Sequence, residues 1–376
     1  MSSGDRIQGA FIGLAIGDAA GWPAARHRSA LLAPWSRRLE RELDAFAEEH
    51  RVTTLPVPFT LNQPVEPLAI GPSDDAEWLA WTALTIHQDR AEAFGGLAGR
   101  TDLRVRISVR AALDNLAAGK APPASGHDNP HHFDDAAAIR AVAFGAAAGN
   151  AAADGPCAAV PAGRRRAAVP ADGPHAAVPA DGRRAAVPAD GAAATAEAGL
   201  RAVVRADASV TNAGDGVHAA LAMAVAIAVL VAGGTMAAAV EAALAELPED
   251  TAIGHASRTA LVVARRAGDP FAAVPALDAA LLDHVYSYGV AAAHTVPVAL
   301  ALAEVSGGSL SAAVPAAACL PSLADSAPAL TGALTGAFTG YRALPEGWRA
   351  AARTLTGCGL PELAGTDLID IAGGLA

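Results

Sequence analysis

The sequence predicts an all-α protein, built as a single large bundle of many helices. Hydrophobic residues make up 52% of the 376 positions but aromatic residues only 4%, so Ala supplies most of the apolar content. Ala is the best helix former and a poor strand former. Leu, Val and Ile recur at helical spacing between Gly and Pro breaks, whereas strand-like alternation is scarce. We therefore expect one helical domain over residues 1–376.

Charge and composition restrict the partners. The formal net charge is −11 and the sequence pI is near 5.4, whereas a nucleic-acid-binding protein needs a basic face, so no nucleic acid is expected. The longest apolar stretch, residues 217–232, is shorter than the roughly 20 residues of a membrane span. It predicts a buried helix and no membrane partner. Three widely spaced Cys and no visible secretory signal predict a cytoplasmic protein.

The first expected helix, residues 5–17, carries glycines at 9, 13 and 17, and glycines at 332, 336 and 340 repeat this spacing. Glycines four residues apart lie on one helical face and let another backbone approach closely. Both rows are therefore expected in the middle of the bundle. Asp18, directly after the first row, either orients a ligand or bonds to backbone amides.

The next element is an acidic loop, residues 71–78, that runs into a helix. Ser73, Asp74 and Asp75 offer hard oxygen ligands of the kind that Mg²⁺ or Ca²⁺ prefers. A second interpretation is purely structural: Asp74 as N-cap with Glu77 three residues later forms a capping box. The residues alone leave both interpretations open.

Residues 127–135 place three His and three Asp just before an apolar helix expected over 136–145. The His residues lack the spacing of a helical zinc motif. The segment is either a capped polar loop or a ligand-binding loop, in which Asp134 and Asp135 are the candidates.

Residues 151–196 differ from the rest of the chain. The unit Ala-Ala-Val-Pro recurs every nine residues, with Val160, Val169, Val178 and Val187 in register. A Pro in every unit prevents a long helix, and the units are too small for a solenoid. We expect a low-complexity insertion between two helices.

A second acidic loop, residues 323–328, precedes the C-terminal glycine row. Asp325 and Ser326 repeat the carboxylate-hydroxyl pairing of the first loop, and a helix cap is again the structural alternative. Two such helix N-termini in one bundle can converge on a cation.

Together these segments resemble the ADP-ribosylglycohydrolase family, of the dinitrogenase-reductase-activating glycohydrolase type. The resemblance follows the order of motifs along nearly the whole chain: residues 8–19 resemble the family's first helix, Gly71–Asp75 its Thr-Asp-Asp loop, Asp134–Gly145 its Gly-Ala-Ala-Met-Arg segment, Thr211-Asn212 a frequent Thr-His, and Ala324–Ser326 its terminal Asp-x-Asp-Thr loop. It implies an orthogonal bundle of the family's type.

The resemblance also implies a function: a hydrolase that cleaves an N- or O-glycosidic bond of an ADP-ribosyl or related ribosyl substrate with the help of Mg²⁺, one or two ions. The partner would be an ADP-ribosylated protein or a small ADP-ribosyl molecule. The residues that match would hold Mg²⁺ (Ser73, Asp74, Asp75, Asp325 and Ser326), line the substrate cleft (Asp18, Asp134 and Asp135) and act as catalytic carboxylates (Asp75 and Glu77).

Two departures from the family's pattern put activity in doubt. Leu323 stands where the family has a metal-binding Asp, and Ala25 stands where it often has a Glu. Losing a carboxylate lowers the charge available to a second cation. The alternative is therefore a non-catalytic relative that binds ADP-ribose or a nucleotide.

Overall fold

The computed structural model describes residues 1–21, 71–153, 189–282 and 289–376. These ranges contain sixteen α-helices, and apart from two isolated bridges they contain no β-structure. The all-α prediction is confirmed. The helices are α1 Ser3–Ala20, α4 Asp74–Leu84, α5 Arg90–Gly95, α6 Ile107–Ala117, α7 Ala124–His127, α8 Ala136–Ala153, α9 Ala189–Thr211, α10 Asp215–Val231, α11 Met236–Ala245, α12 Ala252–Ala267, α13 Pro270–Leu281, α14 Ala292–Val305, α15 Leu310–Ala318, α16 Ala327–Thr339, α17 Glu346–Ala352 and α18 Leu368–Gly373.

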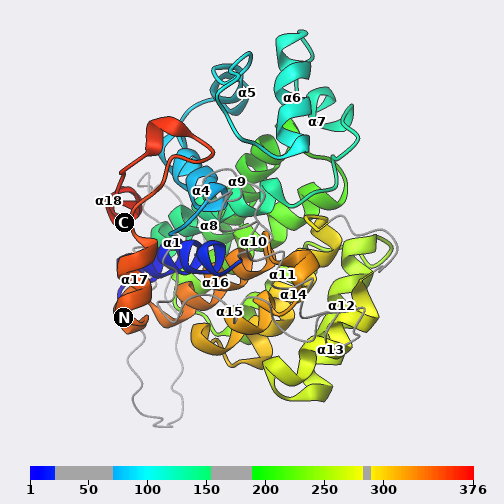
Figure 1. The fold of residues 1–376 in the computed structure, drawn as a ribbon, viewed down its shortest axis with the longest axis vertical. Coiled ribbons are helices and arrows are strands. Elements are labelled where there is room, and N and C mark those ends of the chain that lie inside the picture. The colour runs from blue at the N-terminus through cyan, green and yellow to red at the C-terminus, as the bar shows by residue number, and fades with distance from the viewer. Residues whose placement is uncertain (22–70, 154–188, 283–288) are drawn as a thin grey trace, which may run out of the picture.

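The bundle is built around α1, α8, α10, α14 and α16 (Figure 1). The first of these packs mainly on α16, and α8 packs mainly on α10. Helices α5 to α7 form one end of the molecule, and α12 and α13 form the other. The two termini lie on the same side, beside α17 and α18.

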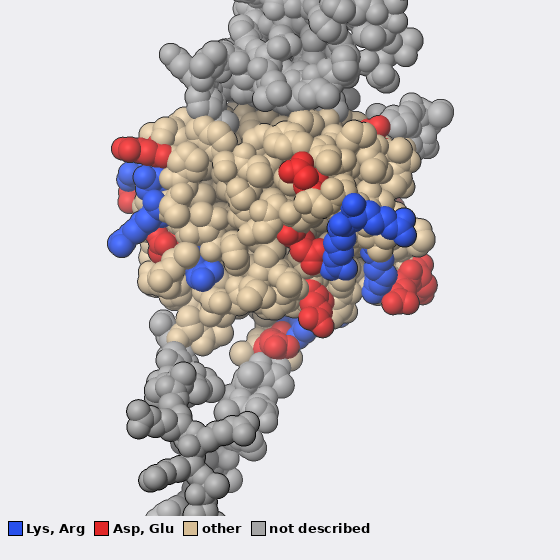
Figure 2. Space-filling model, turned by 90° about the horizontal axis from the view of Figure 1, so that it is seen from below, with Lys and Arg blue, Asp and Glu red and all other residues tan. Residues whose placement is uncertain are grey.

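The apolar stretch expected to be a buried helix forms α10, most of whose residues are buried. The only described helix long and apolar enough to cross a membrane is α8, but 67% of it is buried by its neighbours. Burial of this kind is typical of a core helix. The face seen in Figure 2 shows wide stretches of uncharged surface between a few charged groups, in line with the low charged fraction of 17%.

The repeat segment predicted over 151–196 lies mostly outside the described residues. Helix α8 continues through Ala153, and α9 already begins at Ala189. Residues at both ends of the predicted insertion are therefore helical, and the insertion itself stays a prediction.

The two glycine rows pack against each other. Gly9, Gly13 and Gly17 of α1 face the row of α16. A methyl group added at Gly13 would lie 2.9 Å from the Gly336 Cα and closer still to the Gly332 carbonyl oxygen. Any side chain larger than hydrogen would therefore drive the two backbones apart. The expectation of a close helix contact inside the bundle is confirmed.

We expect Gly13→Ala to lower the free energy of unfolding by about 1–3 kcal/mol, because overpacking against backbone cannot be relieved by moving a side chain. The matched control is Gly199→Ala on α9, an exposed helical glycine with no atom within 4 Å of an added Cβ. The control should stabilise the helix by up to about 1 kcal/mol. Denaturant unfolding of both variants measures the difference. Equal effects would show that the α1–α16 contact does not limit stability.

Candidate functional site

The two acidic loops lie close together at the N-termini of α4 and α16. Asp75 from the first loop and Asp325 from the second both contact one guanidinium, that of Arg106. Arg106 Nη2 lies 2.7 Å from Asp75 Oδ1, and Arg106 Nη1 lies 3.4 Å from Asp325 Oδ2. Nη2 also donates to Ser326 Oγ at 2.7 Å. Segments 250 residues apart in the chain thus share one buried cation.

Neither acidic loop is a simple helix cap. The N-cap residues are Ser73 and Ser326, and neither makes a side-chain capping hydrogen bond. Asp74 is the first residue of α4, one position later than the capping box requires. The capping-box interpretation is therefore wrong for the first loop.

Glu77 holds the C-terminal segment rather than facing the cluster. Its Oε1 accepts a hydrogen bond from the Cys358 amide at 2.8 Å, and its Oε2 accepts from the Gly359 and Leu360 amides, each at 2.7 Å. Both oxygens are thus used on backbone donors, and the residue is fully buried. Glu77 thus anchors residues 358–360, and a catalytic role for it stays a prediction.

Asp18 likewise serves the protein's own backbone. Its Oδ2 accepts from the Ser73 amide at 2.7 Å and from the Ala76 amide at 3.1 Å, while its Oδ1 accepts from Ser73 Oγ. The carboxylate therefore satisfies the free amides at the start of α4, where a negative charge also interacts well with the helix dipole. Of the two predicted uses of Asp18, the structure shows the amide contacts. Asp18 thus positions the acidic loop from α1.

Asp135 completes the ring of carboxylates around Arg106. Its Oδ1 lies 3.2 Å from Arg106 Nη1, and its side chain is fully buried. Burial raises the pKa of Asp135 to about 7, although Arg106 acts in the opposite direction. Burial also raises the pKa of Asp75 well above its usual range, again against the effect of Arg106 and with a smaller contribution from the neighbouring Asp74. The carboxyl of Asp135 can therefore carry a proton close to neutral pH.

Asp134 lies beside this cluster and connects it to α9. Its Oδ1 accepts from Asn212 Nδ2 at 2.8 Å and from the Ala136 amide at 3.2 Å. Its Oδ2 is buried and makes no hydrogen bond with the described residues. A buried carboxylate oxygen without a donor is unusual.

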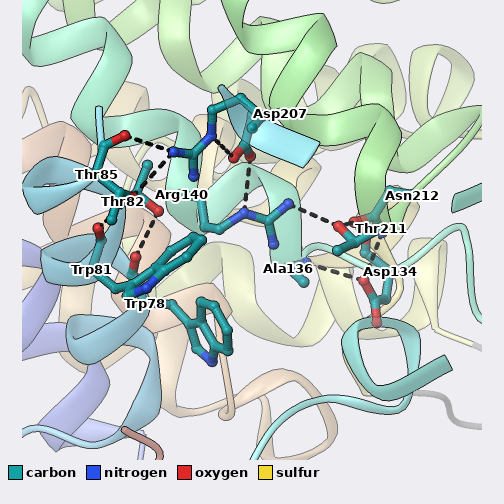
Figure 3. A network of polar contacts seen from close by, with 11 residues as sticks. Trp78, Trp81, Thr82, Thr85, Asp134, Ala136, Arg140, Asp207, Thr211 and Asn212 are labelled. Carbon is teal, nitrogen blue, oxygen red and sulfur yellow. Dashed lines mark hydrogen bonds and ion pairs between the residues drawn. The ribbon is translucent and has the colours of Figure 1, made fainter. Parts of the chain in front are cut away.

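A second buried charge network extends to Asp134 through Thr211 and Asn212 (Figure 3). Asp207 on α9 accepts from Arg90 Nε and from Arg140 Nε, each at 2.9 Å. Arg140 Nη2 donates to Thr211 Oγ1 at 2.8 Å, which in turn donates to Asn212 Oδ1 at 2.6 Å. The chain of contacts ends at Asp134, so packing between α4, α5, α8 and α9 fixes the position of the site.

Two arginines in these networks were missed as site residues by the sequence reasoning. Arg106 is one of several arginines around the start of α6, and the exposed Arg104 precedes it by two residues. No local pattern distinguishes the arginine that turns inward. The sequence around Arg90 does not indicate a buried ion pair either, because its partner Asp207 lies 117 residues away.

The residues expected to hold Mg²⁺ do not fit a pair of ions in this arrangement. No three His, Cys, Asp or Glu side chains of the described residues are placed to hold one metal. Ser73 Oγ donates to Asp18, Ser326 Oγ accepts from Arg106, and Leu323 is buried in the apolar core. Ala25, the other departure, lies outside the described residues. Binding of Mg²⁺ stays a prediction.

A cavity of about 640 Å³ is lined by Asn212, whose side chain donates to Asp134, and by the start of α10. His127, Arg205 and His218 also line it, and no carboxylate does. The wall is therefore basic to neutral, in contrast to the acidic cluster nearby. Such a wall suits an anionic group such as a diphosphate.

Comparison with known proteins gives a consistent result. The family description "ADP-ribosylglycohydrolase" matches residues 1–374. No curated protein matches the sequence. A solved structure described as "ADP-ribosylglycohydrolase-related protein complex" is similar in fold, with a TM-score of 0.54 and 17% identity over 100% of this chain and 98% of that one. At that identity the structural likeness shows the fold alone. The family match spans almost every residue and agrees with the motif order and the helical fold, so this chain belongs to the ADP-ribosylglycohydrolase family.

Proposed function

We propose that the protein hydrolyses an N- or O-glycosidic bond of an ADP-ribosyl or related ribosyl group. The observation that carries this proposal is that Asp75 and Asp135 contact opposite terminal nitrogens of one buried guanidinium. Membership of a glycohydrolase family supports the reaction class. The particular substrate, an ADP-ribosylated protein or a small ADP-ribosyl molecule, is part of the proposal.

Glycosidic hydrolysis uses two carboxyl groups, one to protonate the leaving group and one to activate water or stabilise the sugar cation. Asp75, with its pKa well above the usual range, is suited to donate the proton. Asp135, with a pKa of about 7, is suited to accept a proton from water near neutral pH. Arg106 holds both groups in place and keeps the developing charge balanced.

The rest of the substrate would lie along the cavity beside Asp134. His127, Arg205 and His218 would face the diphosphate, while the unpartnered Asp134 Oδ2 would accept from a ribose hydroxyl. Asn212 joins the two regions, since it lines the cavity and donates to Asp134. The acidic cluster would thus bind the sugar, and the basic wall of the cavity would bind the phosphates of the substrate.

The second candidate is a non-catalytic relative that binds ADP-ribose or a nucleotide. Two observations favour it: Leu323 is buried in the core where a metal-binding carboxylate is expected, and both oxygens of Glu77 are used on backbone amides. Under both candidate functions the protein binds ADP-ribose, but only under the first does it hydrolyse an ADP-ribosyl substrate.

The deciding experiment offers the full chain ADP-ribosylated arginine and serine peptides and follows released ADP-ribose by chromatography. Calorimetric titration with ADP-ribose runs in parallel. Turnover together with binding supports the hydrolase, and binding alone supports the non-catalytic relative. The absence of both turnover and binding would reject both candidates.

We expect Asp135→Asn to lower turnover by about 10²–10⁴-fold, the range typical of a lost general acid or base. The affinity for ADP-ribose should stay within a few-fold, since the amide keeps the size of the carboxyl. Asp114→Asn, an exposed carboxylate on α6, is the control and should leave both quantities unchanged. Turnover of Asp135→Asn near the wild-type rate would remove Asp135 from the reaction.

Asp135 should also make stability depend on pH. The folded pKa is about 7 and the ordinary value is 3.8, so between these pH values the folded chain binds more protons than the unfolded chain. Its contribution to the free energy of unfolding is therefore present below about pH 4 and is lost as the pH rises to about 7. Denaturant unfolding of wild type and Asp135→Asn at several pH values isolates this contribution as their difference. If wild type instead gained stability relative to Asp135→Asn as the pH rises, the result would contradict the raised pKa.

A further inference from the structure

The guanidinium of Arg106 lies at the point where the acidic loops converge. Arg106 is the N-cap of α6, but its side chain makes no capping bond and is 6% exposed. Its two terminal nitrogens contact four oxygens: Asp75 Oδ1, Ser326 Oγ, Asp135 Oδ1 and Asp325 Oδ2. These oxygens come from three separate parts of the chain, the starts of α4 and α16 and the segment before α8.

An arginine suits this position for physical reasons. Its planar fork offers several donors in a fixed geometry, and it stays charged under all ordinary conditions. Burial alone lowers the pKa of Arg106, but Asp135, Asp75 and Asp325 outweigh that effect and raise the pKa well above its usual range. The positive charge is therefore permanent, and it faces three carboxyl groups.

The same oxygens are those that a divalent cation would need. Asp75, Asp325 and Ser326 are expected metal ligands by resemblance, yet each of them contacts Arg106. A metal ion placed among them would lie within a few ångströms of a like charge in a largely buried site. Leu323, with 1% exposure, adds no compensating ligand.

We propose that Arg106 is the resident cation of the acidic cluster, which takes the place of a divalent metal ion and makes the site independent of one. In this arrangement the guanidinium offsets part of the negative charge of the cluster and holds Asp75, Asp135 and Ser326 in one geometry. Arg106 is a positioning residue, and the departure at Leu323 follows from it, since a cluster with a built-in cation needs no further metal ligand. The inference does not depend on which bond the protein cleaves or on whether it cleaves one.

The test asks whether removing the guanidinium creates a metal site. Mn²⁺ serves as the probe, because free Mn²⁺ is measured directly by electron paramagnetic resonance. Wild type and the control Arg104→Met, altered at an exposed arginine two residues away, should bind no Mn²⁺ in the submillimolar range. Arg106→Met, which keeps an unbranched apolar stem and removes the charged guanidinium, should bind Mn²⁺ at least about tenfold more tightly than wild type. A purely structural role for Arg106 would not produce this gain.

Stoichiometric, submillimolar Mn²⁺ binding by wild type would overturn the proposal, as would a folded Arg106→Met variant without any gain in affinity. If Arg106→Met is unfolded alone, Mn²⁺ should restore a cooperative melting transition, because a ligand that binds only the folded state stabilises it. Arg106→Lys keeps the charge as a compact ammonium and should fold without binding Mn²⁺. Arg106→Lys that folds and binds Mn²⁺ as tightly as Arg106→Met would show that the charge at this position does not exclude metal.

Discussion

The direct backbone contact between α1 and α16 sets the geometry on which the site depends. Because glycines face each other along both helices, the two axes approach closer than side chains would allow. Asp18 lies in the last turn of α1, and α16 begins just after Asp325 and Ser326, so the same contact fixes both ends of the acidic cluster. Asp18 then binds the N-terminus of α4 through the Ser73 and Ala76 amides, which brings Asp75 to the same place.

A core of this kind can hold buried charge only where each charge has partners. Two buried networks of acidic side chains have such partners, and in both the partner is arginine. Arg106 serves the acidic cluster, and Arg90 with Arg140 serves Asp207. Removing one partner of a buried pair typically costs about 3–5 kcal/mol, so each network ties together helices that are distant in sequence. Aromatic rings add to the second network: Arg90 lies 5.0 Å from the Trp81 ring and Arg140 lies 5.0 Å from the Phe94 ring.

The two networks meet at neighbouring residues with different tasks. Asp134 takes its support from Asn212 and leaves one oxygen unpartnered among the described residues, whereas Asp135 turns to Arg106. Burial gives Asp135 a pKa of about 7, so one side of this pair can exchange protons while the other can accept a donor from a ligand. Asn212, which donates to Asp134, also lines the basic cavity. The proposed cleavage of a ribosyl glycosidic bond rests on this pair of carboxyls and on the cavity that Asn212 lines.

The sequence by itself determined the features that depend on local rules. Ala content and helical spacing predicted the all-α fold, and the glycine rows predicted a close helix contact, because propensity and periodicity act within a few turns of chain. The order of the acidic loops predicted the family. Only the tertiary structure decided what each charged side chain does: Glu77 anchors residues 358–360, Asp18 binds the start of α4, and Arg106 enters the cluster while Arg104 stays exposed. These assignments depend on which oxygen meets which nitrogen across as many as 283 residues of chain. How the helices dock sets these contacts, and no local pattern does.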